Sequence, residues 1–392
     1  MRIAVDTRSF RPPLTGVGHY VHRLTNAMLP LLSPGEELLS FNGLTIEPVD
    51  RRFLERVEGM NFKQASGDTT PGVLHPRGKT YVFIRQLYPV RVAVRALYAA
   101  RFHAAKKTFD LFHAANYLPP GRLRKPFLPI IYDLSLCRFP ESHPRERVRW
   151  FRRGLKQLAN TPLVQTISEF SKSEIVTLLN IPPDRIYVTY PGFGEAFRPD
   201  GDEDELYLAK HNVKRRAYFL VVGTREPRKN FKTVAEAHTA LPLTVRNNFP
   251  LLWVGASGWG DLDLSPAVTR AQAIGHIRLM GYIPDRDLAA LYRNTVLFMM
   301  PSIYEGFGMP VIEALACDAP VALSKIPVFE EIAADHARYV DPMDTEGWRQ
   351  IMEQSLRERP GPSELVRPRS DLARFSWNAS AKVTLDLFRR LL

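Results

Sequence analysis

The segment PSIYEGFGMPVIEALA, residues 301–316, carries the most specific pattern in the chain. It follows an apolar run at residues 297–300 that predicts a buried strand, and Pro310 suits the first position of a helix. Gly306 and Gly308 would let the backbone approach a ligand closely. Backbone N–H groups at the start of the helix would then point at an anion, aided by the helix dipole. The segment therefore predicts a strand, a phosphate-binding loop and a helix.

Two glutamates flank this loop, Glu305 before the glycines and Glu313 in the first turn of the expected helix. They would place carboxylates at two depths around the phosphate site. A structural interpretation is open for each of them. Ser302 and Glu305 match the spacing of a capping box, and Glu313 could serve only the helix dipole. The glycines and Pro310 argue against a helix that begins at Ser302.

Short apolar runs alternate with helix-like segments on both sides of this stretch. The expected strands are residues 2–5, 111–112, 128–132, 163–166, 186–190, 219–222, 251–254, 277–280, 297–300 and 321–322. Alternating strands and helices predict parallel sheets covered by helices on both faces. The alternation pauses at residues 191–204, which are rich in Gly, Pro and acidic residues and predict a hinge. We expect an α/β protein with domains at residues 1–195 and 196–375 and a last helix within residues 376–392.

Two further loops at strand ends carry residues suited to phosphate binding. Arg225, Arg228 and Lys229 follow the strand at 219–222, and fixed cations can stabilise a leaving diphosphate without a metal. Asn230 after them is a candidate N-cap for the next helix. Gly16 lies in the loop after the first strand, where glycine permits close approach to a phosphate or sugar. A solvated basic turn and an ordinary tight turn are the structural alternatives for the two loops.

The sequence argues against a bound metal. Its only cysteines, Cys137 and Cys317, lack a metal-ligand spacing, so neither a zinc site nor a disulfide scaffold is expected. Three Asp-x-Asp pairs begin at residues 202, 261 and 285. The first lies in the acidic hinge and the third at an expected helix start. Asp261 and Asp263, in a glycine-rich loop, remain the alternative metal ligands.

Taken together, these motifs resemble glycosyltransferase family 4, retaining enzymes of the GT-B fold. The resemblance implies two Rossmann-like domains with a cleft between them, and a C-terminal helix that packs back on the N-terminal, acceptor-binding domain. Glu305 and Glu313 match the family's E-x7-E motif. By that match Glu305 would contact donor sugar hydroxyls near the reacting carbon, and Glu313 the ribose hydroxyls. Backbone N–H groups of Phe307, Gly308 and Met309 would hold the diphosphate.

Other positions of the resemblance complete the expected donor site. Arg228 and Lys229 match the cationic diphosphate clamp, Gly16 matches the N-terminal loop glycine, and the nucleobase would pack on Gly281, Tyr282 and Ile283. Many members have arginine where Thr224 stands, so either Arg225 or Arg228 would contact the diphosphate. Many members have histidine where Tyr132 stands. Candidate acceptor or sugar contacts are Tyr132, Asp133 and His113. For His113, a structural role is the alternative.

The resemblance implies transfer of a hexose from a nucleotide diphosphate sugar to a lipid-linked saccharide in bacterial polysaccharide assembly. Mannose or a related deoxyhexose and a GDP-sugar donor are favoured, because residues 16–20 and 226–230 are similar to mannosyltransferases. The implied enzyme is retaining and needs neither metal nor cofactor. Two alternatives stay open: a nucleotide-sugar epimerase or hydrolase of the same fold, and a basic nucleic-acid-binding protein. No known nucleic-acid-binding module is visible, so nucleic acid is not an expected partner.

The formal net charge is +12, and residues 77–156 alone hold 18 Lys/Arg and four acidic residues, a balance of +14. A helix is expected from about residue 89 to residue 107, with Arg91, Arg95 and Arg101 on a broad cationic face. Such a face favours docking on an anionic membrane, and a solvated surface helix is the alternative. Neither a signal peptide nor an apolar run of roughly 18 residues is present. We therefore expect a cytoplasmic protein, peripheral on the inner face of the cell membrane.

Overall fold

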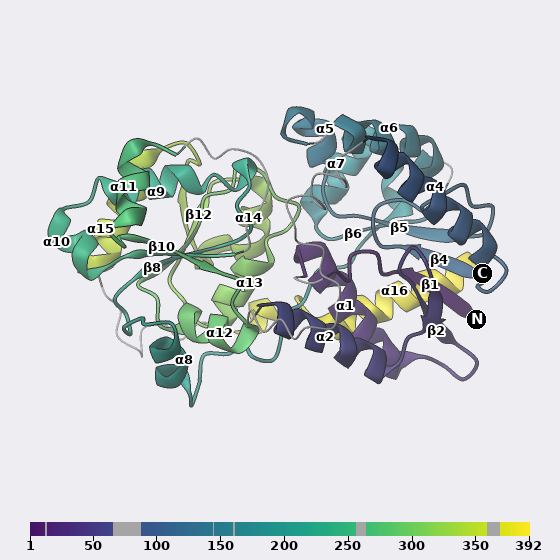
Figure 1. Ribbon diagram of the computed structural model, residues 1–392, viewed down its shortest axis with the longest axis horizontal. Coiled ribbons are helices and arrows are strands. Elements are labelled where there is room, and N and C mark those ends of the chain that lie inside the picture. The colour runs from purple at the N-terminus through teal and green to yellow at the C-terminus, as the bar shows by residue number, and fades with distance from the viewer. Residues whose placement is uncertain (12–13, 66–87, 144, 160, 256–263, 359–368) are drawn as a thin grey trace.

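The computed structural model describes residues 1–11, 14–65, 88–143, 145–159, 161–255, 264–358 and 369–392. Figure 1 shows two α/β domains side by side, each built on its own sheet. The yellow C-terminal helix lies against the purple and blue N-terminal domain. This architecture confirms the expected GT-B arrangement of two Rossmann-like domains.

The described part of the N-terminal domain contains a seven-stranded sheet in the order β3-β2-β1-β4-β5-β6-β7. Neighbouring strands are parallel except for the antiparallel pair β2 and β3. The strands are β1 (Arg2–Asp6), β2 (Glu37–Phe41), β3 (Ile46–Pro48), β4 (Leu111–Ala114), β5 (Phe127–Ile131), β6 (Val164–Thr166) and β7 (Ile186–Val188).

The described part of the C-terminal domain contains a six-stranded, all-parallel sheet in the order β10-β9-β8-β11-β12-β13. Its strands are β8 (Phe219–Val222), β9 (Leu251–Val254), β10 (Ile277–Gly281), β11 (Leu297–Met300), β12 (Val321–Ser324) and β13 (Arg338–Val340). Most of these short runs are buried along their whole length, as expected for strands covered on both faces.

Each sheet has a point where the strand order reverses, between β1 and β4 in the first domain and between β8 and β11 in the second. The chain builds one side of the sheet, then returns to the middle and builds the other side. Loops that leave the two central strands therefore diverge, and ligands of open α/β sheets bind between them. In the second domain these are the loop with Arg228 and Lys229 and the loop with Glu305.

Helices cover both faces of the sheets. They are α1 (Gly16–Met28), α2 (Arg51–Ala65), α4 (Tyr88–Ala105), α5 (Ser135–Arg138), α6 (Arg145–Ala159), α7 (Glu169–Leu179), α8 (Asp204–Lys210), α9 (Phe231–Thr239), α10 (Leu243–Asn248), α11 (Pro266–Ala273), α12 (Asp285–Arg293), α13 (Met309–Ala316), α14 (Pro327–Ala333), α15 (Thr345–Arg357) and α16 (Trp377–Leu391). Within the described ranges, none of the helices combines the length and apolar character that a membrane span needs.

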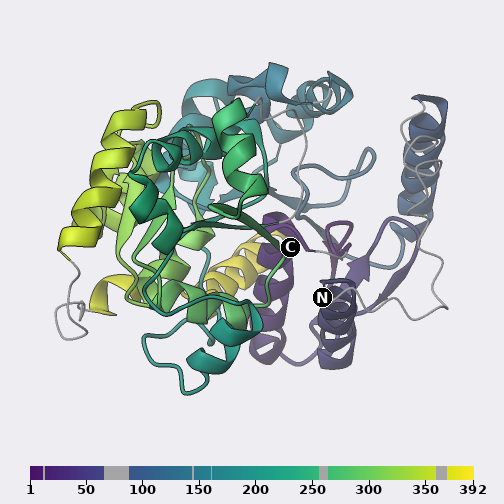
Figure 2. The ribbon, with the colours of Figure 1, turned by 60° about the vertical axis from the view of Figure 1, so that its left-hand side comes forward.

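Helix α16 carries the chain back onto the N-terminal domain, where it packs along α1. Figure 2 shows the yellow helix beside the purple one. Leu385 and Phe388 are buried there, and Gln165 Nε2 on β6 donates to Thr384 Oγ1 at 3.0 Å. The helix and its packing on the N-terminal domain were expected, and Val383 on its outer face is 38% exposed.

The chain crosses between the domains twice. The first crossing follows β7 through residues 189–203, inside which the expected domain boundary falls, and the second leads through residues 369–376 into α16. Three strands were not expected from the sequence: β2, β3 and β13. All three lie toward the edges of their sheets, and β3 and β13 are only three residues long.

Candidate active site

Two loops of the C-terminal domain meet at the point where its strand order reverses. One follows β8 and includes the short 3₁₀ turn Pro227–Lys229, and the other joins β11 to α13. Ile303 N donates to Arg228 O at 2.9 Å, which ties the loops together. This contact places the expected cations and the expected carboxylate side by side, although they lie far apart in the sequence.

Glu305 is the centre of this arrangement and is only 5% exposed. Arg228 Nη1 donates to its Oε2 at 2.9 Å, Lys229 Nζ donates to its Oε1 at 2.5 Å, and Ser302 Oγ donates to the same oxygen at 2.8 Å. Burial alone would raise the pKa of Glu305, but Lys229 and Arg228 outweigh it and lower that pKa to about 2. The side chain is therefore an ionised acceptor at every physiological pH. Ser302 and Glu305 do not form a capping box, because no helix begins at Ser302.

The loop with Arg225, Arg228 and Lys229, here called the cationic loop, carries more positive charge than the two glutamates of the same domain neutralise. Arg228 Nε forms an ion pair with Glu226 Oε2 at 3.2 Å, and burial raises the pKa of Glu226. Arg225 is half-buried in the same loop and makes no hydrogen bond or ion pair with the described residues. Within the C-terminal domain, the three cations Arg225, Arg228 and Lys229 thus accompany two carboxylates, Glu226 and Glu305. This excess of positive charge within the domain suits an anionic ligand.

Asn230 occupies the N-cap position of α9, as expected, but its side chain does not cap the helix. It precedes α9 with a left-handed φ of 52°, and its side chain makes no cap hydrogen bond to the helix backbone. Instead Asn230 Nδ2 donates to Pro301 O at 3.1 Å and to Pro342 O at 2.6 Å. The expectation of a side-chain cap is wrong. Asn230 joins three loops of the domain and thereby fixes the cationic loop against the Glu305 loop.

The Glu305 loop is also held by the N-terminal domain. Gly306 lies against the end of β5, where an added Cβ would stand 2.0 Å from Tyr132 O. Its own carbonyl accepts hydrogen bonds from Ser168 Oγ at 2.7 Å and Ser171 Oγ at 3.1 Å. Only glycine leaves room for this approach of two backbones. Docking of the domains therefore fixes the residue next to Glu305.

Tyr304 makes the corresponding contact on the other side of Glu305. Its hydroxyl donates to Glu174 Oε2 at 2.6 Å and accepts from Leu134 N at 2.9 Å. Arg138 completes the chain of contacts through an ion pair with Glu174 at 2.7 Å. The sequence analysis missed Tyr304 and Glu174, because neither has a local pattern that reveals a partner 130 residues away. A serine before a helix is a recognisable N-cap signal, and Ser168 is the N-cap of α7. Its contact with Gly306 has no such signal in the sequence.

The start of α13 has the geometry expected of a phosphate-binding turn. Gly308 has φ 115° and precedes the helix, and an added Cβ would meet the Phe329 ring at 2.8 Å. The Phe307 side chain is buried against Tyr190 and Phe375, and this packing fixes its backbone in the loop before α13. The N–H groups at the start of α13 provide the donors that an anion needs.

Gly16 lies against the start of α13, whereas Glu313 was expected in the first turn of this helix and in fact lies just beyond it. A Cβ added to Gly16 would stand 3.7 Å from Met309 Cε, so the N-terminal loop reaches this helix. Tyr292 donates to Glu313 Oε2 at 3.4 Å. Loss of hydration, followed by the charge of Asp285, raises the pKa of Glu313 to about 7. Glu313 can therefore exchange a proton near neutral pH, unlike Glu305.

The expected nucleobase segment begins at Gly281, the last residue of β10. Gly281 has φ 69°, and its carbonyl accepts from Gly255 N at 2.7 Å. Ile283 is buried, whereas Tyr282 is half-buried and presents part of its side chain. Asp261 and Asp263, the alternative metal ligands, lie outside the described residues. In the ranges that the structure describes, no group of three or more His, Cys, Asp or Glu side chains is arranged to hold a metal ion.

Asp133 of the N-terminal domain acts on this centre. Its Oδ1 accepts from Ser135 N at 3.1 Å, Ser135 Oγ at 2.8 Å and the Tyr117 hydroxyl at 3.3 Å. Tyr117 holds this position with a left-handed φ of 68°, a conformation that costs a non-glycine residue of order 1–3 kcal/mol. Burial alone would lower the pKa of Arg228, but Glu305 and then Asp133 raise it. Asp133 and Arg228 therefore interact across the domain boundary.

The other two candidate contacts lie in the core of the N-terminal domain. The Tyr132 hydroxyl donates to Ala115 O at 2.9 Å, and its ring is packed edge-on to Tyr20 and Tyr117. His113 is 1% exposed, lies 3.1 Å from Gln165 Oε1 and packs against Phe388 of α16. Burial lowers the pKa of His113 to about 4, so it stays neutral. The position of His113 corresponds to its structural alternative, and Tyr132 is likewise held within the N-terminal domain.

Comparison with known proteins agrees with this geometry. The family described as Glycosyl transferases group 1 matches residues 203–367. The O-antigen chain mannosyltransferase B of Escherichia coli is 32% identical over 396 positions, which cover 100% of both chains. The chain belongs to the group 1 glycosyltransferases. Other relatives of this glycosyltransferase include a serotype-specific mannosyltransferase WbdA of E. coli, 28% identical over 61% of this chain and 30% of that protein.

Solved structures share the fold of this glycosyltransferase at low sequence identity. Sucrose-phosphate synthase from Thermosynechococcus elongatus has a TM-score of 0.69 and 17% identity, and the match covers 100% of this chain and 99% of the other. Anabaena HepE, solved with UDP and glucose, has a TM-score of 0.67 and 15% identity over 99% of both chains. These similarities establish the two-domain fold of the glycosyltransferase and nothing finer.

Proposed function

We propose that this glycosyltransferase transfers mannose, with retention of anomeric configuration, from GDP-mannose to a lipid-linked saccharide in O-antigen or related polysaccharide assembly. The observation that carries the proposal is the buried Glu305 carboxylate held by Arg228 and Lys229 beside the start of α13. The choice of mannose is supported by the full-length relative, which is an O-antigen chain mannosyltransferase.

In this proposal the donor diphosphate binds between the cationic loop and the N-terminus of α13. Lys229 and Arg228 each exchange part of their contact with Glu305 for a phosphate oxygen, and Arg225 is the third available cation. Glu305 is then free to accept hydrogen bonds from the donor sugar hydroxyls. Glu313 would contact the ribose, and Tyr282 would pack near the base. Fixed cations in a partly desolvated site supply the charge stabilisation that a metal supplies in other enzymes.

The transfer step replaces one C–O bond by another on the same face of the sugar. The bond from the anomeric carbon to the leaving phosphate oxygen breaks, and the bond to the acceptor oxygen forms. The acceptor proton passes to the departing phosphate oxygen, so the products are GDP and the extended saccharide. Asp133 would orient the acceptor hydroxyl from the side of the N-terminal domain, because three donors fix its Oδ1 and leave its Oδ2 available.

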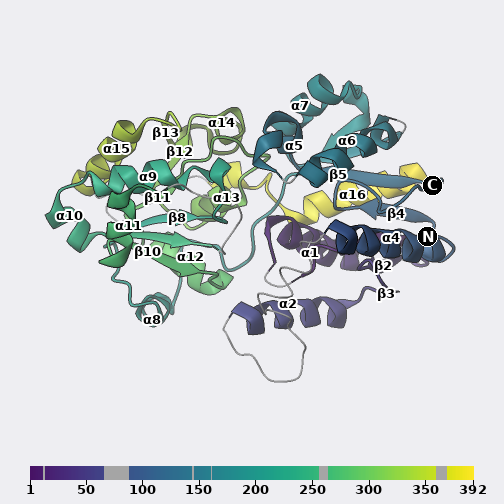
Figure 3. The same cartoon turned by 45° about the horizontal axis from the view of Figure 1, so that its top comes forward.

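We also propose that the N-terminal domain docks on the anionic cytoplasmic face of the membrane, where a lipid-linked acceptor resides. Helix α6 supports this, since five arginines on it are exposed: Arg145, Arg147, Arg149, Arg152 and Arg153. Figure 3 shows α4 and α6 on the same domain. The expected helix α4 is present, and Arg101 on it is exposed, but the side chains of Arg91 and Arg95 lie outside the described residues. Each basic residue near such a surface contributes about 1 kcal/mol.

A donor screen read by nucleotide release, with and without a lipid-linked acceptor, tests the function. GDP-mannose should be consumed only when the acceptor is present, and excess EDTA should leave the rate unchanged. Consumption without acceptor would point to an epimerase or hydrolase. Loss of activity on chelation, restored by Mn²⁺ or Mg²⁺, would contradict the metal-independent site and implicate Asp261 and Asp263.

A further inference from the structure

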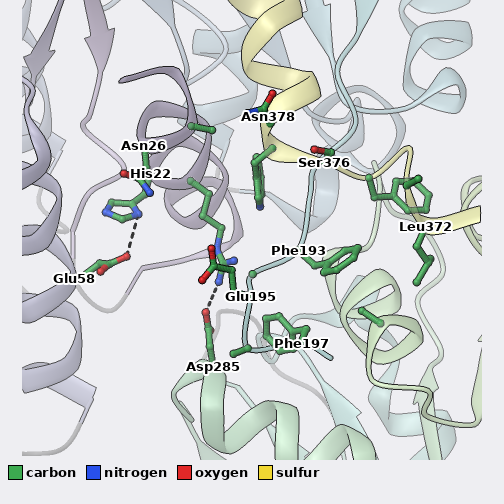
Figure 4. Close-up of a pocket in the computed structure, with 18 residues that line it drawn as sticks. His22, Asn26, Glu58, Phe193, Glu195, Phe197, Asp285, Leu372, Ser376 and Asn378 are labelled. Carbon is green, nitrogen blue, oxygen red and sulfur yellow. Dashed lines mark hydrogen bonds and ion pairs between the residues drawn. The ribbon is translucent and has the colours of Figure 1, made fainter. Parts of the chain in front are cut away.

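A cavity of about 800 Å³ lies at the hinge, within the ~300–1,000 Å³ range of small-molecule sites. Figure 4 shows the side chains that line it. Its walls come from α1, α2 and α16, from both crossings between the domains, and from α12 and α13. Arg23 on α1 and Asp285 on α12 form an ion pair across the domain boundary in one wall. The cavity is distinct from the donor site, because neither Glu305 nor the cationic loop lines it.

Several polar side chains around this hinge cavity are available to form hydrogen bonds with a ligand. The amides of Asn26 and Asn378 and the carboxylate of Glu195 are exposed, and they make no hydrogen bond or ion pair with the described residues. A primary amide offers two donors and one acceptor oxygen, which suits vicinal hydroxyl groups. Aromatic rings line the same space, among them Phe193 and Trp377, and provide flat apolar surface.

The charge of the cavity disfavours an anion. The described residues that line it include one fully charged cation, Arg23, against the carboxylates of Glu58, Glu195 and Asp285. The remaining basic group, His22, is buried, and burial lowers its pKa, so it is neutral at pH 7. A phosphate or a nucleotide would meet net negative charge here. Free amides, an exposed carboxylate and aromatic faces together match a neutral, polyhydroxylated ligand.

We propose that the hinge cavity binds a neutral oligosaccharide, namely a segment of the mannose-containing chain that the enzyme extends. The identity of the sugar rests on the proposed function, whereas the cavity and its chemistry do not. The segment would lie away from the reacting end, because the cavity meets α13 at Ala316, the last residue of that helix, whereas Glu305 lies before its first residue. An enzyme that adds to a polymer would then recognise the chain as well as its terminal residue.

Binding in this cavity would affect donor binding through the hinge. The cavity is lined by both domains, so its shape depends on how they are docked, and a ligand favours the docking that fits it best. Arg23 and Asp285 line the cavity and also affect the pKa of Glu313, at the expected ribose site: Asp285 raises it and Arg23 lowers it. By reciprocity, the oligosaccharide should change donor affinity by the same factor that the donor changes oligosaccharide affinity.

The test measures binding of a free α-linked mannotetraose by calorimetry, without donor and without lipid. The double variant Asn26→Ala/Asn378→Ala should bind at least fivefold more weakly than the wild type, and Ala373→Trp, which places bulk in the cavity, should abolish binding. Asn248→Ala, at an exposed position on α10 remote from the hinge, is the matched control and should bind like the wild type. Melting temperatures of all variants verify that they fold.

Lys229→Ala separates this inference from the proposed function. It should lose transfer activity and keep mannotetraose binding, since Lys229 does not line the cavity. Wild-type affinity in both hinge variants would overturn the hinge site while leaving the transferase assignment intact. Loss of binding in Lys229→Ala alone would place the oligosaccharide at the reaction centre instead. Binding of spermidine or inorganic phosphate with no binding of mannotetraose would also overturn the proposal.

Discussion

At the scale of single residues, Glu305 and Glu313 show how surroundings separate two carboxylates of one motif. Glu305 lies between Lys229 and Arg228, which outweigh its burial and hold its pKa at about 2, whereas burial and then the charge of Asp285 raise the pKa of Glu313 to about 7. The two glutamates lie on either side of the start of α13. Their spacing in the sequence gives no sign that their pKa values differ. Their different charge states at neutral pH agree with different partners on the donor.

Lys229→Ala should lower kcat/KM for mannose transfer by about 10²-fold or more, because one donor of transition-state stabilisation is lost. The loop should keep its fold, because two other hydrogen bonds hold it. The side-chain amide of Asn230 donates to Pro301 O, and Ile303 N donates to Arg228 O. The measurement is steady-state kinetics of GDP release, with Lys214→Ala, an exposed lysine of the same domain, as the matched control. A variant with wild-type kcat/KM would show that Lys229 does not contact the diphosphate.

Glu313→Gln should alter the pH dependence of stability. The folded protein keeps a proton on Glu313 up to about pH 7, whereas an unfolded glutamate releases it near pH 4.5. The folded state therefore binds more protons in this window, and the contribution of this group to the free energy of unfolding falls as pH rises through it. Melting temperatures at pH 5 and pH 8 should show the variant gaining stability relative to the wild type at the higher pH. A constant difference would contradict the raised pKa.

At the scale of elements, α6 shows a cationic surface that the sequence located only in part. The excess of basic residues at 77–156 was evident, and the sequence analysis expected the docking face on the helix seen here as α4, where the side chains of Arg91 and Arg95 lie outside the described residues. In α6 the apolar residues Val148, Phe151 and Leu158 are buried. The arginines between them are exposed because the helical period turns them to the opposite face.

Charge reversal on α6 tests membrane docking. The variant Arg149→Glu/Arg152→Glu/Arg153→Glu should lose co-sedimentation with phosphatidylglycerol-containing liposomes at low salt, and wild-type binding should weaken as salt rises. The matched control reverses three exposed cations of the C-terminal domain, Lys214, Arg270 and Lys325, and changes the net charge equally. Equal loss of binding in both variants would indicate a general charge effect and no docking face on α6.

The elements that position the site were largely predictable, and their long-range contacts were not. Strands β8, β9 and β11 have the expected bounds, because continuous apolar runs between glycines and prolines are strong local signals. Strand β13 was missed, since the exposed Arg338 at its start interrupts such a run. The Tyr304–Glu174 contact depends on how two separate domains meet, which no local pattern encodes.

At the scale of the whole molecule, α16 makes the two domains one structural unit. It begins beside the hinge cavity, runs along α1 and ends near β2, where Arg389 pairs with Glu36 at 2.9 Å. Two crossings, one at residues 189–203 and one at 369–376, connect the domains at the same boundary. Relative motion of the domains is thereby limited to rotations that both crossings permit.

Phe388→Ala should destabilise the protein by about 3–5 kcal/mol, as removal of a large buried aromatic side chain does. Phe388 is fully buried and packs on His113 in the N-terminal domain. Urea unfolding followed by circular dichroism measures the loss, and Val383→Ala, at an exposed position of the same helix, is the control. If both variants unfold at the same urea concentration as the wild type, α16 does not support the N-terminal domain.

The course of α16 also has a consequence for the order of folding during synthesis. The N-terminal domain is translated first, yet the helix that covers α1 and His113 is translated after the whole C-terminal domain. Domains commonly fold in the order in which they leave the ribosome, but here the later domain can be complete while the earlier one still exposes an apolar face. A nascent chain of this protein therefore carries an unfinished first domain until the last helix emerges, and that interval is when chaperones would be needed most.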